Sequence, residues 1–140
     1  MSESFTKIIA FIRKHHVMSL ATNYKDELSV CSLFYTYNEE RNIFIVASSR
    51  DTEHVRHILK DSKIAGNILL ETKTVGEIKG LQFKGQCYEI EEKLLKLEYF
   101  KAYPYALALN PTLWKIEIES FKLTDNALGF GKKILWSREN

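Results

Sequence analysis

The sequence lacks a long hydrophobic segment, a disulfide framework and an excess of one charge. Its 140 residues include two cysteines, two prolines and six glycines. Cys31 and Cys87 lie in separate apolar, strand-like runs without a CxxC partner, so we expect buried thiols in a reducing compartment. The apolar run at 8–12 is flanked by charges and is too short for a secretory or membrane-spanning segment. We therefore expect a cytoplasmic protein that does not bind membranes.

The charge is nearly balanced, with 20 lysines and arginines against 18 aspartates and glutamates. These residues are scattered along the chain rather than gathered into a basic tail or stripe. Only two short segments, KGLQFKG and GKK, form local basic patches. Binding to the phosphate backbone of a nucleic acid usually needs a longer basic surface, so we expect no nucleic-acid partner.

Several catalytic and nucleotide-binding motifs are also missing. Residues 129–133, GFGKK, lack the third glycine of a dinucleotide-binding loop and the Lys-Ser/Thr ending of a P-loop. No GxSxG nucleophile elbow occurs, and neither cysteine has a catalytic context. Nucleophilic catalysis therefore has little support.

The sequence does contain alternating helical and strand patterns over one domain, residues 1–140, without a linker or repeat. Ser4 is a plausible N-cap for an amphipathic helix over 4–16, and Ser49 or Asp51 for a helix that buries Val55, Ile58 and Leu59. A third helical pattern begins near Leu94 and ends before Pro104. The expected strands lie at 17–22, 28–37, 42–48, 63–70, 78–91 and 113–123, and a glycine-rich tail follows at 124–136.

Six strands and three helices indicate an α+β fold dominated by an antiparallel barrel. A barrel of this size is filled by its own side chains. A ligand as large as a flavin would then lie outside the barrel, in a groove that a second copy of the chain completes.

One segment, IFIVASSRDTEH at 43–54, combines the end of an apolar strand with hydroxyl and basic side chains. A helix start has unpaired backbone N–H groups and the positive end of the peptide dipole, so it favours anions. The residues that we expect to hold a phosphate here are Ser48, Ser49, Arg50, Thr52 and His54. The alternative interpretation is an ordinary helix N-cap with solvated neighbours.

Three further sets of candidate binding residues each have a functional and a structural interpretation. His54 and His57 are three residues apart on one helix face, but no carboxylate or cysteine accompanies them at metal-site spacing, so we expect no metal. Alternation along a strand places Gln82 and Lys84 on one face, which is either solvent-exposed or ligand-facing. Lys132, in the glycine-rich tail, is a candidate to contact an anionic ligand.

The order of these elements resembles that of the FMN-binding split barrels, the superfamily of pyridoxamine 5'-phosphate oxidase. GLQFKG at 80–85 and TDNALGFGKKILW at 124–136 are similar to stretches of the YhbP-like bacterial proteins within that superfamily. The resemblance implies a six-stranded antiparallel split β-barrel with peripheral helices. It also implies a homodimer with FMN at the subunit interface and Gln82 beside the flavin ring.

Within that resemblance, the family's Thr-x-His looks like Thr52-Glu53-His54. The oxidases tend to have Ser-Arg-Lys in this segment, so a carboxylate and a titratable imidazole replace two permanent cations. Arg50 is the residue that can restore a positive charge.

The anion-binding segment and the resemblance together predict an FMN-binding protein, and the resemblance implies that it oxidises or reduces a small molecule at a homodimer interface. The alternatives are a non-catalytic split-barrel module without flavin, and a heme- or deazaflavin-binding variant of the same barrel. No catalytic residue is assigned, because a flavin carries the redox chemistry itself.

Overall fold

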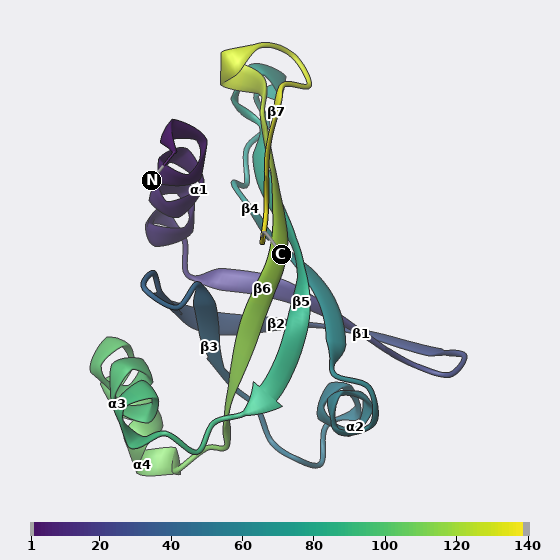
Figure 1. Ribbon diagram of the computed structural model, residues 1–140, viewed down its shortest axis with the longest axis vertical. Coiled ribbons are helices and arrows are strands. Elements are labelled where there is room, and N and C mark those ends of the chain that lie inside the picture. The colour runs from purple at the N-terminus through teal and green to yellow at the C-terminus, as the bar shows by residue number, and fades with distance from the viewer. Residues whose placement is uncertain (1, 139–140) are drawn as a thin grey trace.

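The computed structural model describes residues 2–138, shown in Figure 1. Its helices are α1 (Glu3–Lys14), α2 (Glu53–Lys60), α3 (Lys93–Ala102) and α4 (Pro104–Leu109), with short 3-10 turns η1 (Val75–Glu77) and η2 (Asn126–Leu128). The strands are β1 (Val17–Tyr24), β2 (Glu27–Asn38), β3 (Ile43–Ala47), β4 (Lys63–Leu69), β5 (Lys79–Glu89), β6 (Leu113–Asp125) and β7 (Lys133–Ser137). None of the helices in this range is long and apolar enough to cross a membrane.

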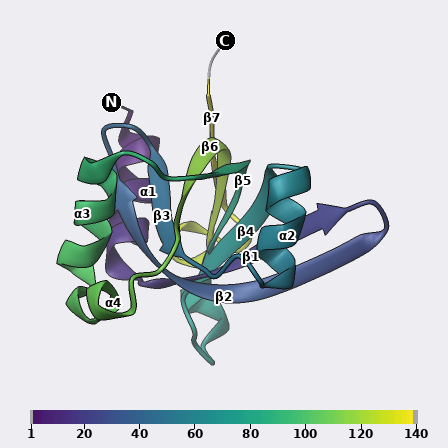
Figure 2. The same cartoon turned by 90° about the horizontal axis from the view of Figure 1, so that it is seen from below.

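The seven strands form one antiparallel sheet in the order β3-β2-β1-β4-β5-β6-β7. A further pairing of β3 with β6 closes the first six strands into a ring. Figure 2 shows α3 and α4 on one side of this ring and α2 on the other. The expected α+β class and antiparallel sheet are confirmed.

The strand count differs from the six expected, because the tail contains β7. β6 pairs with β3 through Leu113–Glu117 and with β7 through Ser120–Thr124, so one edge of β6 serves two neighbours in succession. The tail returns along β6 after a turn in which Gly129 and Gly131 have φ of +137° and +73°. These glycines permit a backbone conformation that other residues rarely adopt.

Aromatic and aliphatic side chains fill the inside of the ring. Phe44, Phe83 and Phe121 are each no more than 2% exposed, and Phe44 lies 5.0 Å from Phe83 between ring centroids. Gly66 faces these rings, and a Cβ atom there would lie 2.4 Å from the Phe83 ring. A glycine at this position therefore gives the aromatic core its room.

Two helix starts and one buried position differ from expectation. Ser2, not Ser4, caps α1 and accepts a hydrogen bond from the Phe5 amide at 3.1 Å. Thr52, rather than Ser49 or Asp51, caps α2. Leu59 is 55% exposed, because the buried face of α2 is completed by His54 and His57 instead. The predicted buried face of this helix included only apolar residues, but buried histidines occupy part of it.

The third helical pattern also continues beyond Pro104 into α4, which was not expected. Pro104 occupies the first turn of α4, where its missing N–H needs no partner. The helix ends at Asn110, which has a left-handed φ of +47°.

Candidate functional site

The β3–α2 junction, residues 48–54, connects the end of β3 to the start of α2. Ser48 and His54 face each other, with 2.5 Å between Ser48 Oγ and His54 Nε2. Thr52 Oγ1 lies 3.4 Å from the same imidazole nitrogen. The structure thus brings three of the five residues predicted to hold a phosphate into one small cluster.

The hydroxyl groups of the junction already have partners within the chain. Thr52 Oγ1 donates to the Ser49 carbonyl at 2.7 Å and accepts from the Val55 amide at 3.4 Å. Ser49 Oγ donates to Asp51 Oδ1 at 2.5 Å. The N-terminus of α2 is therefore capped by its own side chain, as the alternative interpretation of this segment expected.

The charge of Arg50 is also partnered. Its guanidinium forms an ion pair with Glu89 at the end of β5 and lies 5.8 Å from the centre of the Trp114 ring. The Trp114 indole donates to the Ser48 carbonyl at 2.9 Å and so ties the junction to β6.

The two histidines of α2 use different partners. His57 Nδ1 lies 2.9 Å from Thr22 Oγ1 on β1, whereas His54 faces Ser48. Burial lowers the pKa of His54, the neighbouring His57 lowers it further, and Glu53 opposes the shift. Near neutral pH the His54 imidazole is thus uncharged and does not add a cation to the junction.

Gln82 and Lys132 do not join the junction within one chain. Gln82 lies seven residues before Glu89, the partner of Arg50, on β5, which is roughly 23 Å of extended strand. Lys132 is exposed in the turn between η2 and β7. The predicted site residues therefore fall in three places on the subunit.

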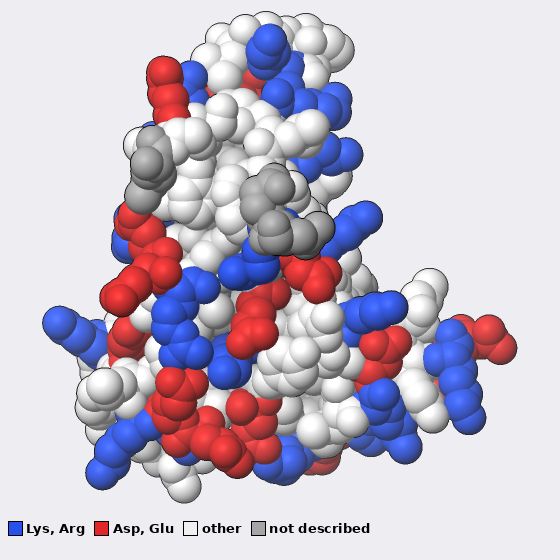
Figure 3. Space-filling view, viewed as in Figure 1, with Lys and Arg blue, Asp and Glu red and all other residues white. Residues whose placement is uncertain are grey.

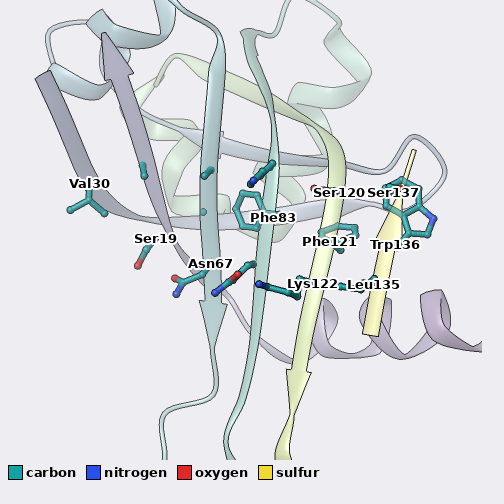
Figure 4. Close-up of a pocket in the computed structure, with 15 residues that line it drawn as sticks. Ser19, Val30, Asn67, Phe83, Ser120, Phe121, Lys122, Leu135, Trp136 and Ser137 are labelled. Carbon is teal, nitrogen blue, oxygen red and sulfur yellow. The ribbon is translucent and has the colours of Figure 1, made fainter. Parts of the chain in front are cut away.

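Gln82 belongs instead to a groove on the outer face of the sheet, with a volume of about 1070 Å³ (Figure 4). We call this the outer-face groove. Strands β1, β2, β4, β5, β6 and β7 form it, and its lining residues are Ser19, Ala21, Val30, Ala65, Gly66, Asn67, Gln82, Phe83, Lys84, Ser120, Phe121, Lys122, Leu135, Trp136 and Ser137.

Strand register arranges the outward side chains of the groove in two rows. One row runs through Ala21, Ala65, Lys84, Ser120 and Ser137 on successive strands. The other row runs through Ser19, Asn67, Gln82, Lys122 and Leu135, and four of its members are visible in line across Figure 4. As predicted, Gln82 and Lys84 face outward while Leu81 and Phe83 face the core.

Within residues 2–138 none of the lining residues is acidic, whereas Lys84 and Lys122 both line the groove. Elsewhere charges of both signs mix, as the lower part of Figure 3 shows, where acidic and basic side chains alternate. The groove therefore combines positive charge with the hydroxyl and amide donors of the two rows.

Apolar groups border the groove at both ends. Val30 on β2 and Leu135 on β7 are 72% and 69% exposed. Trp136 also lines the groove, but it pairs with Phe121 across β6 and β7 and stacks on Phe5 of α1 at 5.2 Å between ring centroids, so its indole packs with the core-facing aromatic residues. The groove thus offers apolar side chains as well as polar groups.

Sequence reasoning missed most of the groove, including Asn67 and Lys122. The alternation of β4 and β6 places them on outward positions, but which strands lie side by side is not visible in that pattern. The thiol of Cys87 takes no part, because it is buried in the core and burial raises its pKa to about 12.

Comparison with known proteins places the chain in a family. It is 31% identical to the UPF0306 protein of Photorhabdus laumondii over 140 residues, covering 98% of each chain. The chain belongs to the UPF0306 family. It is also 32% identical to the UPF0306 protein YhbP of Escherichia fergusonii over 141 residues, covering 99% of this chain and 96% of that one, so the YhbP resemblance is confirmed. No family model matches the sequence.

Solved structures share the fold of this UPF0306 protein at low sequence identity. A heme binding protein from Mycobacterium smegmatis superposes with a TM-score of 0.79 at 13% identity, covering 98% of this chain and 59% of that one. A FAD-binding protein from Mesorhizobium loti superposes with a TM-score of 0.71 at 12% identity, covering 88% and 94%. At this identity the likeness establishes the fold alone.

Proposed function

We propose that this UPF0306 protein is a split-barrel protein that binds FMN in the outer-face groove and uses it to oxidise or reduce a small molecule. The observation that carries the proposal is the chemistry of the groove. It joins apolar side chains, amide and hydroxyl donors and two lysines, and none of its lining residues within 2–138 is a carboxylate. A planar, anionic cofactor matches that combination.

The lining residues suit a flavin better than heme. Heme iron is usually held by His, Cys, Met or Tyr. None of these residue types lines the groove. Gln82 and Asn67, by contrast, can exchange hydrogen bonds with the carbonyl and N–H edge of a flavin ring. The choice rests on these lining residues, since the solved structures of similar fold include both a heme binding protein and a FAD-binding protein.

A bound flavin would supply the redox chemistry, and the residues of this chain would orient it and limit its contact with water. The groove is open, whereas small-molecule sites usually bury most of the ligand. We therefore propose that a second copy of the chain covers it, with the exposed Val30 and Leu135 in the interface. Light scattering should then give about twice the 16.3 kDa of one chain, and Leu135→Glu should lower that mass.

The β3–α2 junction, where the sequence predicts a phosphate site, is the alternative position for the phosphate. If Arg50 and His54 contact it, from either subunit, the double change Arg50→Ala, His54→Ala should weaken FMN binding by about 1 to 3 kcal/mol. Unchanged affinity in that variant would remove the junction from the site.

Visible spectroscopy of the purified protein between about 300 and 700 nm, followed by FMN titration monitored by flavin fluorescence, tests the proposal. Saturable binding near or below micromolar, roughly −8 kcal/mol, is expected. Ala65→Phe, which places a ring in the middle of the groove, should weaken binding at least tenfold. Asn23→Phe is the matched control, because Asn23 is an exposed β1 residue outside the lining set.

A circular dichroism melt of both variants separates loss of the groove from loss of the fold, and Ser19→Phe repeats the test from a neighbouring strand. Unchanged affinity in folded Ala65→Phe and Ser19→Phe would contradict the groove as the site.

The second candidate function is a non-catalytic binding module that has lost the flavin. The ion pair between Arg50 and Glu89, together with Glu53 beside the predicted anion position, favours it. Colourless protein that does not bind FMN at physiological concentrations would support this candidate and reject the flavin proposal.

A further inference from the structure

Lys84 and Lys122 are distinguished by their place, because they are the two basic residues that line the outer-face groove. Neither forms an ion pair or a side-chain hydrogen bond within residues 2–138. By contrast, the ion pairs of this range join Arg13 to Glu39, Arg41 to Glu92, Arg50 to Glu89, Lys79 to Asp125, and Lys115 to Glu92 and Glu117.

The two lysines are also held close together by the sheet. Lys84 pairs with Ser120 and Gln82 pairs with Lys122, so Lys84 and Lys122 are diagonal neighbours on β5 and β6. Diagonal neighbours in an antiparallel pair are about 7 to 8 Å apart, and two lysine side chains can converge from that spacing on one anion. Like charges at this separation repel each other, and an anion between them relieves the repulsion.

The neighbouring donors complete the anion-binding geometry. Gln82 is directly opposite Lys122 and two residues before Lys84 on β5, and Ser120 is directly opposite Lys84. Charge-assisted hydrogen bonds to phosphate or carboxylate oxygens are stronger than those between neutral groups. The groove therefore has both the charge and the donors that an oxyanion requires.

We propose that Lys84 and Lys122 bind the anionic group of the groove ligand, a phosphate or a carboxylate. This inference rests on the proposed function, because it assigns the charge recognition within the same groove. The anion has two sources: the phosphate of the flavin itself or a small anionic substrate beside it. In either case the specificity for charge lies on β5 and β6 rather than at the β3–α2 junction.

The test compares FMN with riboflavin, which lacks the phosphate, on the wild type and on Lys84→Gln, Lys122→Gln. The control is Lys63→Gln, Lys93→Gln, which removes the same charge at two exposed lysines outside the groove. If the lysines bind the cofactor phosphate, FMN affinity falls at least tenfold in the first variant, riboflavin affinity changes less than twofold, and the control matches the wild type.

A second arm titrates the protein with inorganic phosphate and follows the amide resonances of Lys84 and Lys122 by NMR. If the anion belongs to a substrate, both flavins keep their affinity, and the phosphate response of the wild type is lost only in Lys84→Gln, Lys122→Gln. Equal weakening of FMN and riboflavin, or no effect on either flavin or phosphate, would overturn the inference. A wild type that binds phosphate through these lysines but binds neither flavin would reject the proposed function and retain the anion site.

Discussion

The β3–α2 junction and the outer-face groove contain similar kinds of side chain, namely hydroxyls, amides or imidazoles, and cations. At the junction these groups are bonded to one another: Thr52 caps α2, Arg50 pairs with Glu89, and Ser48 meets His54. In the groove Lys84 and Lys122 face outward, and neither has an acidic partner in the part of the chain that the structure describes. The types of side chain are similar in the two regions, so they identify both as candidate binding sites. The regions differ in whether the hydrogen-bonding groups and charges of those side chains are already paired within the chain, and a ligand needs groups that are not.

This comparison also separates stability from binding. The junction is tied to β6 by the Trp114 indole and to β5 by Arg50, so its polar groups hold the ring together. The groove lies over a core that is complete without the lysines. Changes at the junction should therefore lower stability, and changes on the groove surface should lower affinity.

The largest expected effect comes from Gly85→Ala, which disrupts the β5–β6 pair that carries both lysines. A Cβ atom at Gly85 would lie 2.1 Å from the Glu117 carbonyl oxygen, at a register shift between the two strands. We expect the free energy of unfolding in urea to fall by about 1 to 3 kcal/mol, with weaker FMN binding. Gly76→Ala is the control, since no atom lies within 4 Å of the added carbon, and a similar loss in both variants would contradict the account.

A smaller effect is expected at the junction from Thr52→Ala. Loss of the helix cap should reduce the free energy of unfolding by about 1 kcal/mol, and Thr52→Ser should retain most of it. FMN affinity should stay within twofold of the wild type in both variants. A tenfold loss of affinity in Thr52→Ala alone would move the phosphate site back to the junction.

The smallest effect concerns pH. Because burial lowers the pKa of folded His54 below its unfolded value, the unfolded chain binds more protons in the window below about pH 6.5, and stability falls there with acidification. His54→Gln should flatten this dependence between about pH 7.5 and 5, and His15, whose pKa burial also lowers, should leave a residual slope. Urea unfolding at several pH values measures it, and an unchanged slope would show that His54 titrates as in the unfolded chain.

The sequence was sufficient for much of the fold. Alternation correctly put Gln82 and Lys84 on the face opposite to the buried Leu81 and Phe83. The missed element, β7, is five residues long and depends on pairing with β6 across a glycine turn. Local periodicity has little weight in so short a segment, and its partner is not encoded locally.

The site was less predictable, because its chemistry depends on contacts between distant segments. No acidic partner for Arg50 could be predicted from the sequence, because its partner Glu89 lies 39 residues away along the chain. Lys122 had no motif around it and becomes a candidate only because β6 lies beside β5. The sequence shows that hydroxyl and cationic side chains occur at a strand-to-helix turn. It does not show whether those side chains already bond to other parts of the chain.

The two tryptophans provide the most direct test, because Trp136 lines the groove and Trp114 holds the junction. Each gives one indole N–H resonance in a ¹H–¹⁵N spectrum, and Trp114→Phe and Trp136→Phe assign the pair. We predict that FMN shifts the Trp136 resonance and leaves that of Trp114, whose N–H is bonded to the Ser48 carbonyl, in place. A shift of Trp114 with Trp136 unchanged would contradict the groove as the ligand site.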